Sequence, residues 1–322
     1  MAAALRQATS QHGHGSWLDR IVLQREAFRR LSEKPVLRPM GRDEERGVFN
    51  PGVIRLDGKG SELFMLYRAD GCDGVSHLKA AASSTGGMSW ERTGRALQNP
   101  SDHVQLEDPR LTRIEGSIIM TCTEANLSEG SWRIGIYALS DEKFSRVGGI
   151  GGGNENNKNG VLFPERIEGK YVMMTRPTPR QGTPAAEPQS IGLSAADDLD
   201  GPWTAEARSF IEPREHWETG RVGAAAPPVL IKIGDGDKAW FILYHASDRG
   251  NVYRLGGALF DYKLKDQLWR SPVPLLEPEM PWEKKNIVGK GGIVFSCNLI
   301  EMETGARTFY GAGDFFIGVA GV

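Results

Sequence analysis

The sequence predicts an all-β protein, a five-bladed β-propeller with an N-terminal helix, whose ring is closed by an N-terminal strand. Two observations predict this fold: a phrase of two apolar runs around a short turn occurs five times, and the last copy lacks a strand that the N-terminal region can supply. The copies enter at Pro51, Pro109, Pro164, Pro228 and Cys297, which are 58, 55, 64 and 69 residues apart. Strand repeats of roughly 40–50 residues or more are typical of propeller blades.

Each copy contains the elements of a blade. Its two apolar runs, such as VIRL and LFMLY in the first copy, are rich in Val, Ile, Leu, Phe, Tyr and Met and flank a Gly-rich or charged turn, a pattern that predicts a β-hairpin. A third run rich in small residues follows. In the first four copies an aromatic residue then begins an outer strand, at Trp90, Phe144, Trp203 and Trp269.

The fifth copy ends at Val322 without an outer strand. The N-terminal segment KPVLRP, residues 34–39, can complete that blade and remove the open sheet edge. Before it, residues 16–33 carry apolar side chains at near-helical spacing, and Ser16 can cap the helix. We therefore predict a tail and amphipathic helix over residues 1–33 and a propeller catalytic domain over residues 34–322. The helix is either a plain surface helix or an element of a homo-oligomer interface.

Composition excludes several functions. A formal net charge of −2 gives no electrostatic case for binding nucleic acid or an anionic membrane. No run of 18 apolar residues predicts a membrane span, and the N-terminal apolar patch is too short for a signal-peptide core. Cys72, Cys122 and Cys297 form no CxxC pair, so neither a disulfide framework nor a metal site is expected. These features predict a cytoplasmic protein.

Ligands of propellers bind at the ring axis, where the loops that enter the innermost strands converge. The entry phrases are polar, as in FNPG, QLEDPR, NKNGVLFPE and GRVGAAAPP. The second strands also end on polar residues, namely Arg68, Glu124, Arg176, His245 and Asp314. Charged groups at a buried axis need a ligand or one another, so this set predicts either a binding site or inter-blade ion pairs.

The ordered strings NPGVI, LYRAD, EDPRLT, VLFPERIEGKYVMMTRP, VGAAAPPV, LYHA, VYRLGGALFD and FYGAGDFFIGVA resemble glycoside hydrolase family 130. The resemblance runs from about Lys34 to Val322. It implies a five-bladed propeller, in agreement with the repeat count. It also implies inverting phosphorolysis of β-mannosides, such as β-1,2- or β-1,4-mannooligosaccharides, mannosyl-N-acetylglucosamine or mannosylglucose, to α-mannose 1-phosphate.

The resemblance also implies roles for individual residues. Asp108 in EDPR would be the catalytic acid, with the proton passing through the 3-hydroxyl of the sugar. The phosphate would be held by Lys158, Arg176, His245 and Tyr253, with Arg254 as a further candidate, and the mannose by Asn50, Arg68 and Asp314. Inorganic phosphate would be a co-substrate, and neither a cofactor nor a metal is expected.

Two other functions stay open from the sequence. A β-mannosidase of the same family would use water and would need a second carboxylate as its base. A carbohydrate-binding propeller without activity would lack the acid, whereas Asp108 is present. The linkage and the acceptor sugar are not predicted, although Trp217 and Trp282 in loops before the fourth and fifth blades are candidates for stacking on the acceptor.

Overall fold

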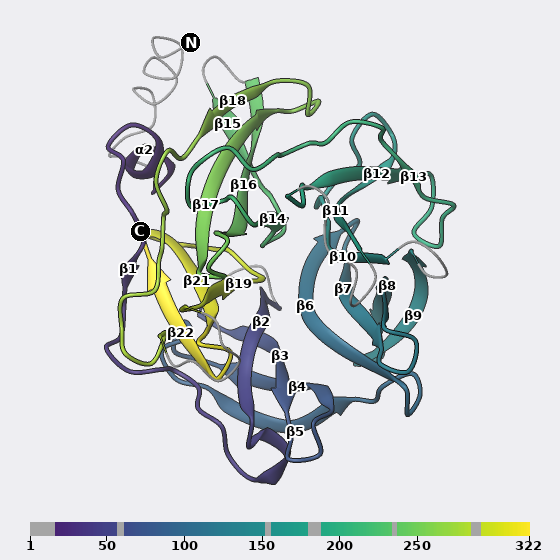
Figure 1. The fold of residues 1–322 in the computed structure, drawn as a ribbon. Helices are drawn as coiled ribbons and strands as arrows, with labels where there is room; N and C mark the ends of the chain where they lie inside the picture. The colour runs from purple at the N-terminus through teal and green to yellow at the C-terminus, as the bar shows by residue number, and fades with distance from the viewer. Residues whose placement is uncertain (1–16, 57–60, 152–155, 180–187, 234–236, 285–290) are drawn as a thin grey trace.

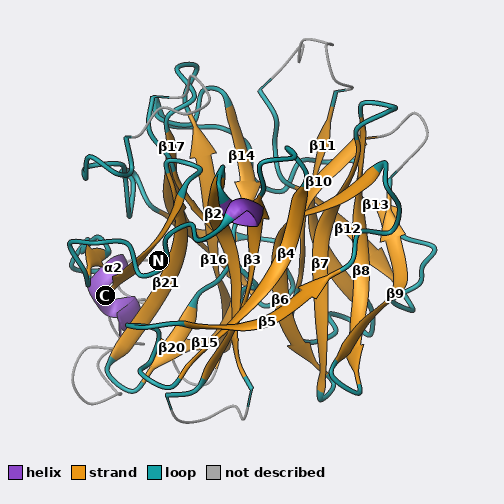
Figure 2. Ribbon diagram, turned by 90° about the horizontal axis from the view of Figure 1, so that it is seen from below, coloured by secondary structure: helices purple, strands orange, loops and turns teal. Residues whose placement is uncertain are grey.

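The computed structural model describes the chain except residues 1–16, 57–60, 152–155, 180–187, 234–236 and 285–290. The described strands form five antiparallel sheets arranged around a common centre (Figure 1). From the side, most strands run between the two faces of the ring (Figure 2). The predicted five-bladed propeller is confirmed. The predicted cap Ser16 lies outside the described residues.

The first three blades follow one another along the chain. Blade 1 consists of β2 (Gly47–Arg55), β3 (Leu63–Asp70), β4 (Ser76–Ser83) and β5 (Glu91–Leu97), preceded by the short 3-10 helix η1 (Arg42–Glu44). Blade 2 consists of β6 (Val104–Ile114), β7 (Ser117–Asn126), β8 (Ser131–Ser140) and β9 (Lys143–Ile150). Blade 3 consists of β10 (Asn156–Leu162), β11 (Tyr171–Thr178), β12 (Gly192–Ala196) and β13 (Thr204–Ala205).

In the last two blades the inner strand is divided. Blade 4 has β14 (Arg221–Ala224) and β15 (Val229–Ile233), which pair one after the other with β16 (Asp237–Ser247), followed by β17 (Tyr253–Asp261) and β18 (Gln267–Arg270). Blade 5 has β19 (Val294–Ser296) and β20 (Ile300–Met302) on β21 (Gly305–Ala312), then β22 (Phe316–Gly321) and β1 (Arg29–Arg30).

The N-terminal segment closes the ring, as predicted, but it starts to do so before residue 34. Strand β1 pairs with β22 through Arg29 and Arg30, and a further bridge joins Leu37 to Ile317. The predicted strand at 34–39 therefore contributes one bridge, whereas the paired strand lies in the segment assigned to the helix. Closure covers the edge of β22, which would otherwise present unpaired backbone groups.

The N-terminal helix is shorter than predicted. Helix α2 spans only Trp17–Val22, and Arg25, with a φ of 58°, cannot continue it. Trp17 and Ile21 are buried in the core cluster shared by blades 4 and 5, and the Trp17 ring packs edge-on against Phe241 at 5.1 Å. The predicted N-terminal helix is confirmed, but its predicted extent to residue 33 is wrong. Residues 29 and 30 instead pair with β22, a non-local contact that local periodicity does not report.

Apolar side chains fill the space between neighbouring blades. Five buried clusters each combine residues of two adjacent blades; for example, Met65 of blade 1 and Phe309 of blade 5 share one cluster. Burial of such side chains stabilises each by about 1.5–3 kcal/mol. The hydrophobic core therefore consists of the interfaces between neighbouring blades, and the polar residues at the ring axis are not part of it.

A repeated buried cluster fixes the loop that enters three of the blades. In blade 4 the Tyr244 hydroxyl donates to Glu218 at 2.7 Å, and Arg270 from the outer strand binds the same carboxylate at 2.8 Å. Equivalent clusters are Glu44–Tyr67–Arg92 in blade 1 and Glu283–Tyr310–Arg30 in blade 5. Each glutamate also accepts backbone N–H bonds from its own loop. The loops at the mouth of the ring are thereby anchored.

These clusters correct two predictions. Trp217 is 2 % exposed and stacks on Tyr244, and Trp282 stacks on Tyr310 while its Nε1 donates to the Glu33 carbonyl. Both indoles thus support the loop anchors and are not available to stack on an acceptor sugar. The sequence could not distinguish these structural tryptophans from sugar-binding ones, because both lie in polar loops.

Candidate active site

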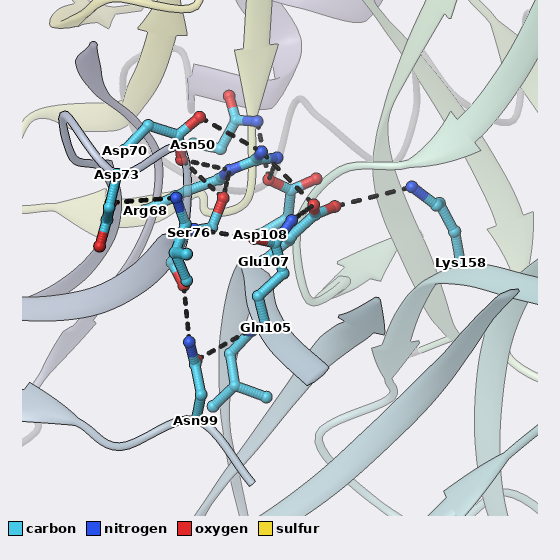
Figure 3. A network of polar contacts seen from close by, with 12 residues as sticks. Asn50, Arg68, Asp70, Asp73, Ser76, Asn99, Gln105, Glu107, Asp108 and Lys158 are labelled. Carbon is cyan, nitrogen blue, oxygen red and sulfur yellow. Dashed lines mark hydrogen bonds and ion pairs between the residues drawn. The ribbon is translucent and has the colours of Figure 1, made fainter. Parts of the chain in front are cut away.

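A cavity of about 1020 Å³ lies where the five blades meet. Every blade contributes lining residues, among them Arg68, Asp108, Arg176, Tyr253 and Asp314. A network of polar contacts along its wall joins blades 1, 2 and 3 (Figure 3). The cavity is large enough for a disaccharide-sized ligand.

β-Bulges direct polar side chains toward the axis. The pairing register of the first strands shifts at Asn50, Asp108 and Asn159, in blades 1, 2 and 3, and these residues have φ of 48°, 53° and 55°. A bulge adds one unpaired residue and re-aims its side chain. Positive φ strains a residue other than glycine, and strained residues of this kind cluster at active sites as well as in turns.

Asp108 is held by blade 1. The Asn50 amide Nδ2 donates to Asp108 Oδ1 at 2.8 Å, and Arg68 Nη1 lies 3.7 Å from the same oxygen (Figure 3). Burial raises the pKa of Asp108, but Arg68, Arg110 and the Asn50 hydrogen bond outweigh it and lower the pKa below its ordinary value. The carboxyl is therefore ionised at neutral pH in the free protein.

Arg68 connects the carboxylates on this side. Its Nε binds Asp70 Oδ1 at 3.1 Å, and its Nη2 lies 3.4 Å from Glu107 Oε1. The guanidinium also stands 4.9 Å from the Phe49 ring centroid, within cation–π range. These contacts fix the guanidinium toward Asp108, where it can bind a sugar hydroxyl and hold the carboxylate in place.

Glu107 is a functional candidate that sequence reasoning missed. It is 7 % exposed, lines the cavity and lies between Arg68 and Lys158, whose Nζ is 3.6 Å from Glu107 Oε2 (Figure 3). Burial lowers the pKa of Lys158, and its ammonium also lies 4.4 Å from the Trp132 ring centroid. The sequence signal was the glutamate in the EDPR motif. It was missed because side chains alternate along a strand, so the residue next to Asp108 is expected to point to the opposite face.

The opposite end of the cavity, formed by blades 3 and 4, is cationic. Arg176 is 6 % exposed, its Nε has no hydrogen-bond partner among the described residues, and burial lowers its pKa to about 10. Arg221, which the sequence interpretation also missed, lines the same end and donates to Asn251 Oδ1 at 3.0 Å. Its signal was its place in the polar entry phrase GRVGAAAPP.

Of the predicted site residues, His245 and Arg254 do not line the cavity. His245 is fully buried behind Arg176, with Nε2 3.4 Å from Arg176 Nη1. Because a guanidinium only donates, Nε2 accepts this contact. Burial and Arg176 hold the pKa of His245 well below its usual value, so the ring is neutral. A Cβ on Gly223 would come within 2.4 Å of Nε2, and this close approach requires glycine.

The structure brings the other seven predicted residues together. Asn50, Arg68, Asp108, Lys158, Arg176, Tyr253 and Asp314 all line the cavity. Glu124 does not: its carboxylate is buried and binds Tyr137 and Arg146 within blade 2. Glu124 therefore stabilises its own blade, and it forms neither part of the site nor the inter-blade ion pair that the strand ends predicted as the alternative.

In the described parts of the chain, no group of three His, Cys, Asp or Glu side chains is placed to hold a metal ion. No helix in those parts is long and apolar enough to cross a membrane.

Residues 16–322 match the glycoside hydrolase family 130 model, which is described as β-1,4-mannooligosaccharide phosphorylase. The chain belongs to glycoside hydrolase family 130. Family 130 relatives from Thermoanaerobacter sp. (strain X514) include a 1,2-β-oligomannan phosphorylase, 34 % identical over 91 % of this chain and 96 % of the relative. A β-1,2-mannobiose phosphorylase of the same organism is 33 % identical over 90 % and 95 %.

The family 130 fold is shared with solved structures. The β-1,2-mannobiose phosphorylase of Listeria innocua, in complex with β-1,2-mannobiose, superimposes with a TM-score of 0.72 at 23 % identity, covering 91 % of this chain and 96 % of that one. In this chain the cavity combines a carboxylate on blade 2 with the buried Arg176 on blade 3 and the half-buried Arg221 on blade 4. Such a cavity can hold a neutral sugar at its acidic end beside an anion at its cationic end.

Proposed function

We propose that the chain is an inverting β-mannoside phosphorylase. The observation that carries this proposal is Arg176, a buried guanidinium that lines the cavity with no carboxylate contact among the described residues. A buried cation without an anionic partner is costly, and a bound phosphate would supply the missing negative charge. Phosphorylase names among relatives at about one third identity support the same reaction.

In the proposed complex, phosphate binds Arg176, Arg221, Lys158 and Tyr253, with His245 supporting Arg176 from behind. The mannose lies against Asn50, Arg68 and Asp314. A phosphate oxygen then forms a bond to the anomeric carbon while the bond from that carbon to the acceptor oxygen breaks. Holding both reactants in place removes much of the entropic cost of bringing them together.

The acceptor oxygen gains a proton as it leaves. Asp108 would provide it, through the 3-hydroxyl of the mannose as the family resemblance implies. Phosphate monoanion or dianion carries the proton that is lost in forming the sugar phosphate ester, so the net transfer is from phosphate to the acceptor. Because Asp108 is ionised in the free protein, it must take up its proton once the substrates are bound.

Hydrolysis is the alternative, and the lining residues argue against it. A water-using inverting enzyme needs a base on the face of the sugar opposite the leaving group. The described residues that blades 3 and 4 place in the cavity wall are Lys158, Asn159, Arg176, Arg221, Asn251 and Tyr253, and none is a carboxylate.

The test is phosphate dependence. We expect release of α-mannose 1-phosphate, detected by ³¹P NMR, when the protein and phosphate are incubated with β-1,2-mannobiose. β-1,2-Linked mannosides are the first substrates to try because of the two relatives above, with β-1,4-mannobiose as the comparison. Release of free mannose at the same rate without phosphate would contradict the proposal.

A further inference from the structure

The cavity extends beyond the residues assigned to mannose and phosphate, to the mouth of the ring over blades 1 and 5. Here the side chains of Glu45, Arg46, Cys72 and Phe315 line it. Glu45 and Arg46 are exposed, and their side chains have no hydrogen-bond or ion-pair partner among the described residues. An arginine and a glutamate side by side without partners offer donors and acceptors to a polar ligand.

This part of the wall is built as one unit. The Val48 N–H donates to the Phe315 carbonyl at 3.2 Å, and a Cβ on Gly47 would come within 2.8 Å of the Asp314 carbonyl oxygen. Arg46 N–H donates to the Asp70 carbonyl, and its guanidinium lies over Gly74. The segment that carries Glu45 and Arg46 is therefore packed directly against the Asp314–Phe315 turn.

The geometry of the reaction determines which substrate contacts the part of the cavity lined by Glu45, Arg46 and Phe315. In an inverting displacement, the nucleophile and the leaving group occupy opposite faces of the anomeric carbon. The cationic end, with Arg176 and Arg221, is on blades 3 and 4, and blade 1 lies across the ring from them (Figure 1). The leaving acceptor must then point away from blades 3 and 4, toward blade 1 and its neighbour blade 5.

We propose that Glu45, Arg46 and Phe315 form the acceptor-sugar subsite and select the acceptor. Arg46 and Glu45 hydrogen-bond adjacent hydroxyls of a neutral hexose, and its apolar face packs on the Phe315 ring, which is fixed by edge-on contact with Phe316 at 4.7 Å. The inference rests on the proposed phosphorolysis, because it takes the phosphate to lie at the cationic end.

The experiment runs the reaction in the synthetic direction, from α-mannose 1-phosphate and a panel of mannose, glucose and N-acetylglucosamine. Loss of a charged hydrogen bond predicts that Arg46→Ala raises the acceptor KM about tenfold or more. We expect the KM for α-mannose 1-phosphate to change less than twofold, by about the scatter of a neutral surface change. Phe315→Ala should change the ratio of kcat/KM among the three acceptors.

Arg95→Ala is the matched control, because Arg95 lies on the outer strand of the same blade, pairs with Glu142 and is absent from the cavity wall. Unchanged acceptor KM and unchanged acceptor ratios in both site variants would overturn the subsite. An equal rise in the KM of α-mannose 1-phosphate would overturn it as well. If the wild-type protein makes no disaccharide with any acceptor, the proposed function itself fails.

Discussion

Replacing Arg176 with methionine should stabilise the protein and strongly weaken phosphate binding. Arg176 is 6 % exposed, and burial together with Arg221 and Arg110 lowers its pKa from 12.5 to about 10, although Tyr253 acts in the other direction. At about 1.4 kcal/mol per pH unit, keeping the charge in the fold costs roughly 3 kcal/mol. Since the folded-state pKa is the lower one, this cost is present at every pH below about 10.

Methionine retains much of the apolar stem without the charge. We therefore expect Arg176→Met to raise the free energy of unfolding by about 1–3 kcal/mol, measured by urea titration without phosphate. Losing charge-assisted hydrogen bonds at about 1.5–3 kcal/mol each should weaken phosphate affinity about a hundredfold or more. Phosphate should accordingly raise the Tm of the wild type and leave that of the variant unchanged.

Arg254→Met is the matched control. Arg254 is half-buried on the same side of the ring, but it pairs with Asp248 at 2.8 Å and Glu277 at 3.2 Å and does not line the cavity. Its replacement should give no gain in stability and should keep the phosphate-induced rise in Tm. The reasoning is refuted if Arg176→Met is less stable than the wild type without phosphate, or if phosphate still raises its Tm.

Two further predictions concern the acid and the second cation. Asp108→Asn should lower kcat by about 10²–10⁴-fold while phosphate still raises Tm. Because the folded-state pKa of Asp108 is lowered, the stability it contributes is present above its ordinary pKa of 3.8 and is lost as the pH falls through the folded value. The free energy of unfolding of the variant should thus fall less than that of the wild type between pH 5 and about pH 2. Full activity of the variant, or the same loss of stability in acid as the wild type, would exclude Asp108 as the catalytic acid. Arg221→Ala should raise the phosphate KM about tenfold or more with little change in the mannoside KM, and equal rises in both would place Arg221 outside the phosphate site.

Local patterns were sufficient to predict the blades. Apolar runs of strand length around Gly-rich turns specify hairpins wherever they occur, and five copies in sequence specify a ring. The polar strand ends were also informative, because equivalent ends of five blades converge on one axis. Arg68, Arg176 and Asp314 were found in this way. Asn50 and Asp108 came from the family resemblance, and all five line the cavity.

Side-chain direction was not predictable at the same positions. Glu124 and Arg176 both lie near the ends of second strands, yet Glu124 binds Arg146 inside its blade and Arg176 faces the cavity. Side chains alternate along a strand, so a bulge or a shift of one residue changes the face that each one meets. Sequence alone gives neither the register nor the bulge.

The sequence by itself determined the all-β class, the five repeats and closure by the N-terminal region, because these depend on residue type and spacing, and the family resemblance added most of the residues that line the cavity. Only the tertiary structure decided the short helix, the burial of His245 behind Arg176, the anchoring roles of Trp217 and Trp282, and the places of Glu107 and Arg221 in the cavity. Each of these depends on contacts between segments far apart in the chain, and it is packing between blades that sets them.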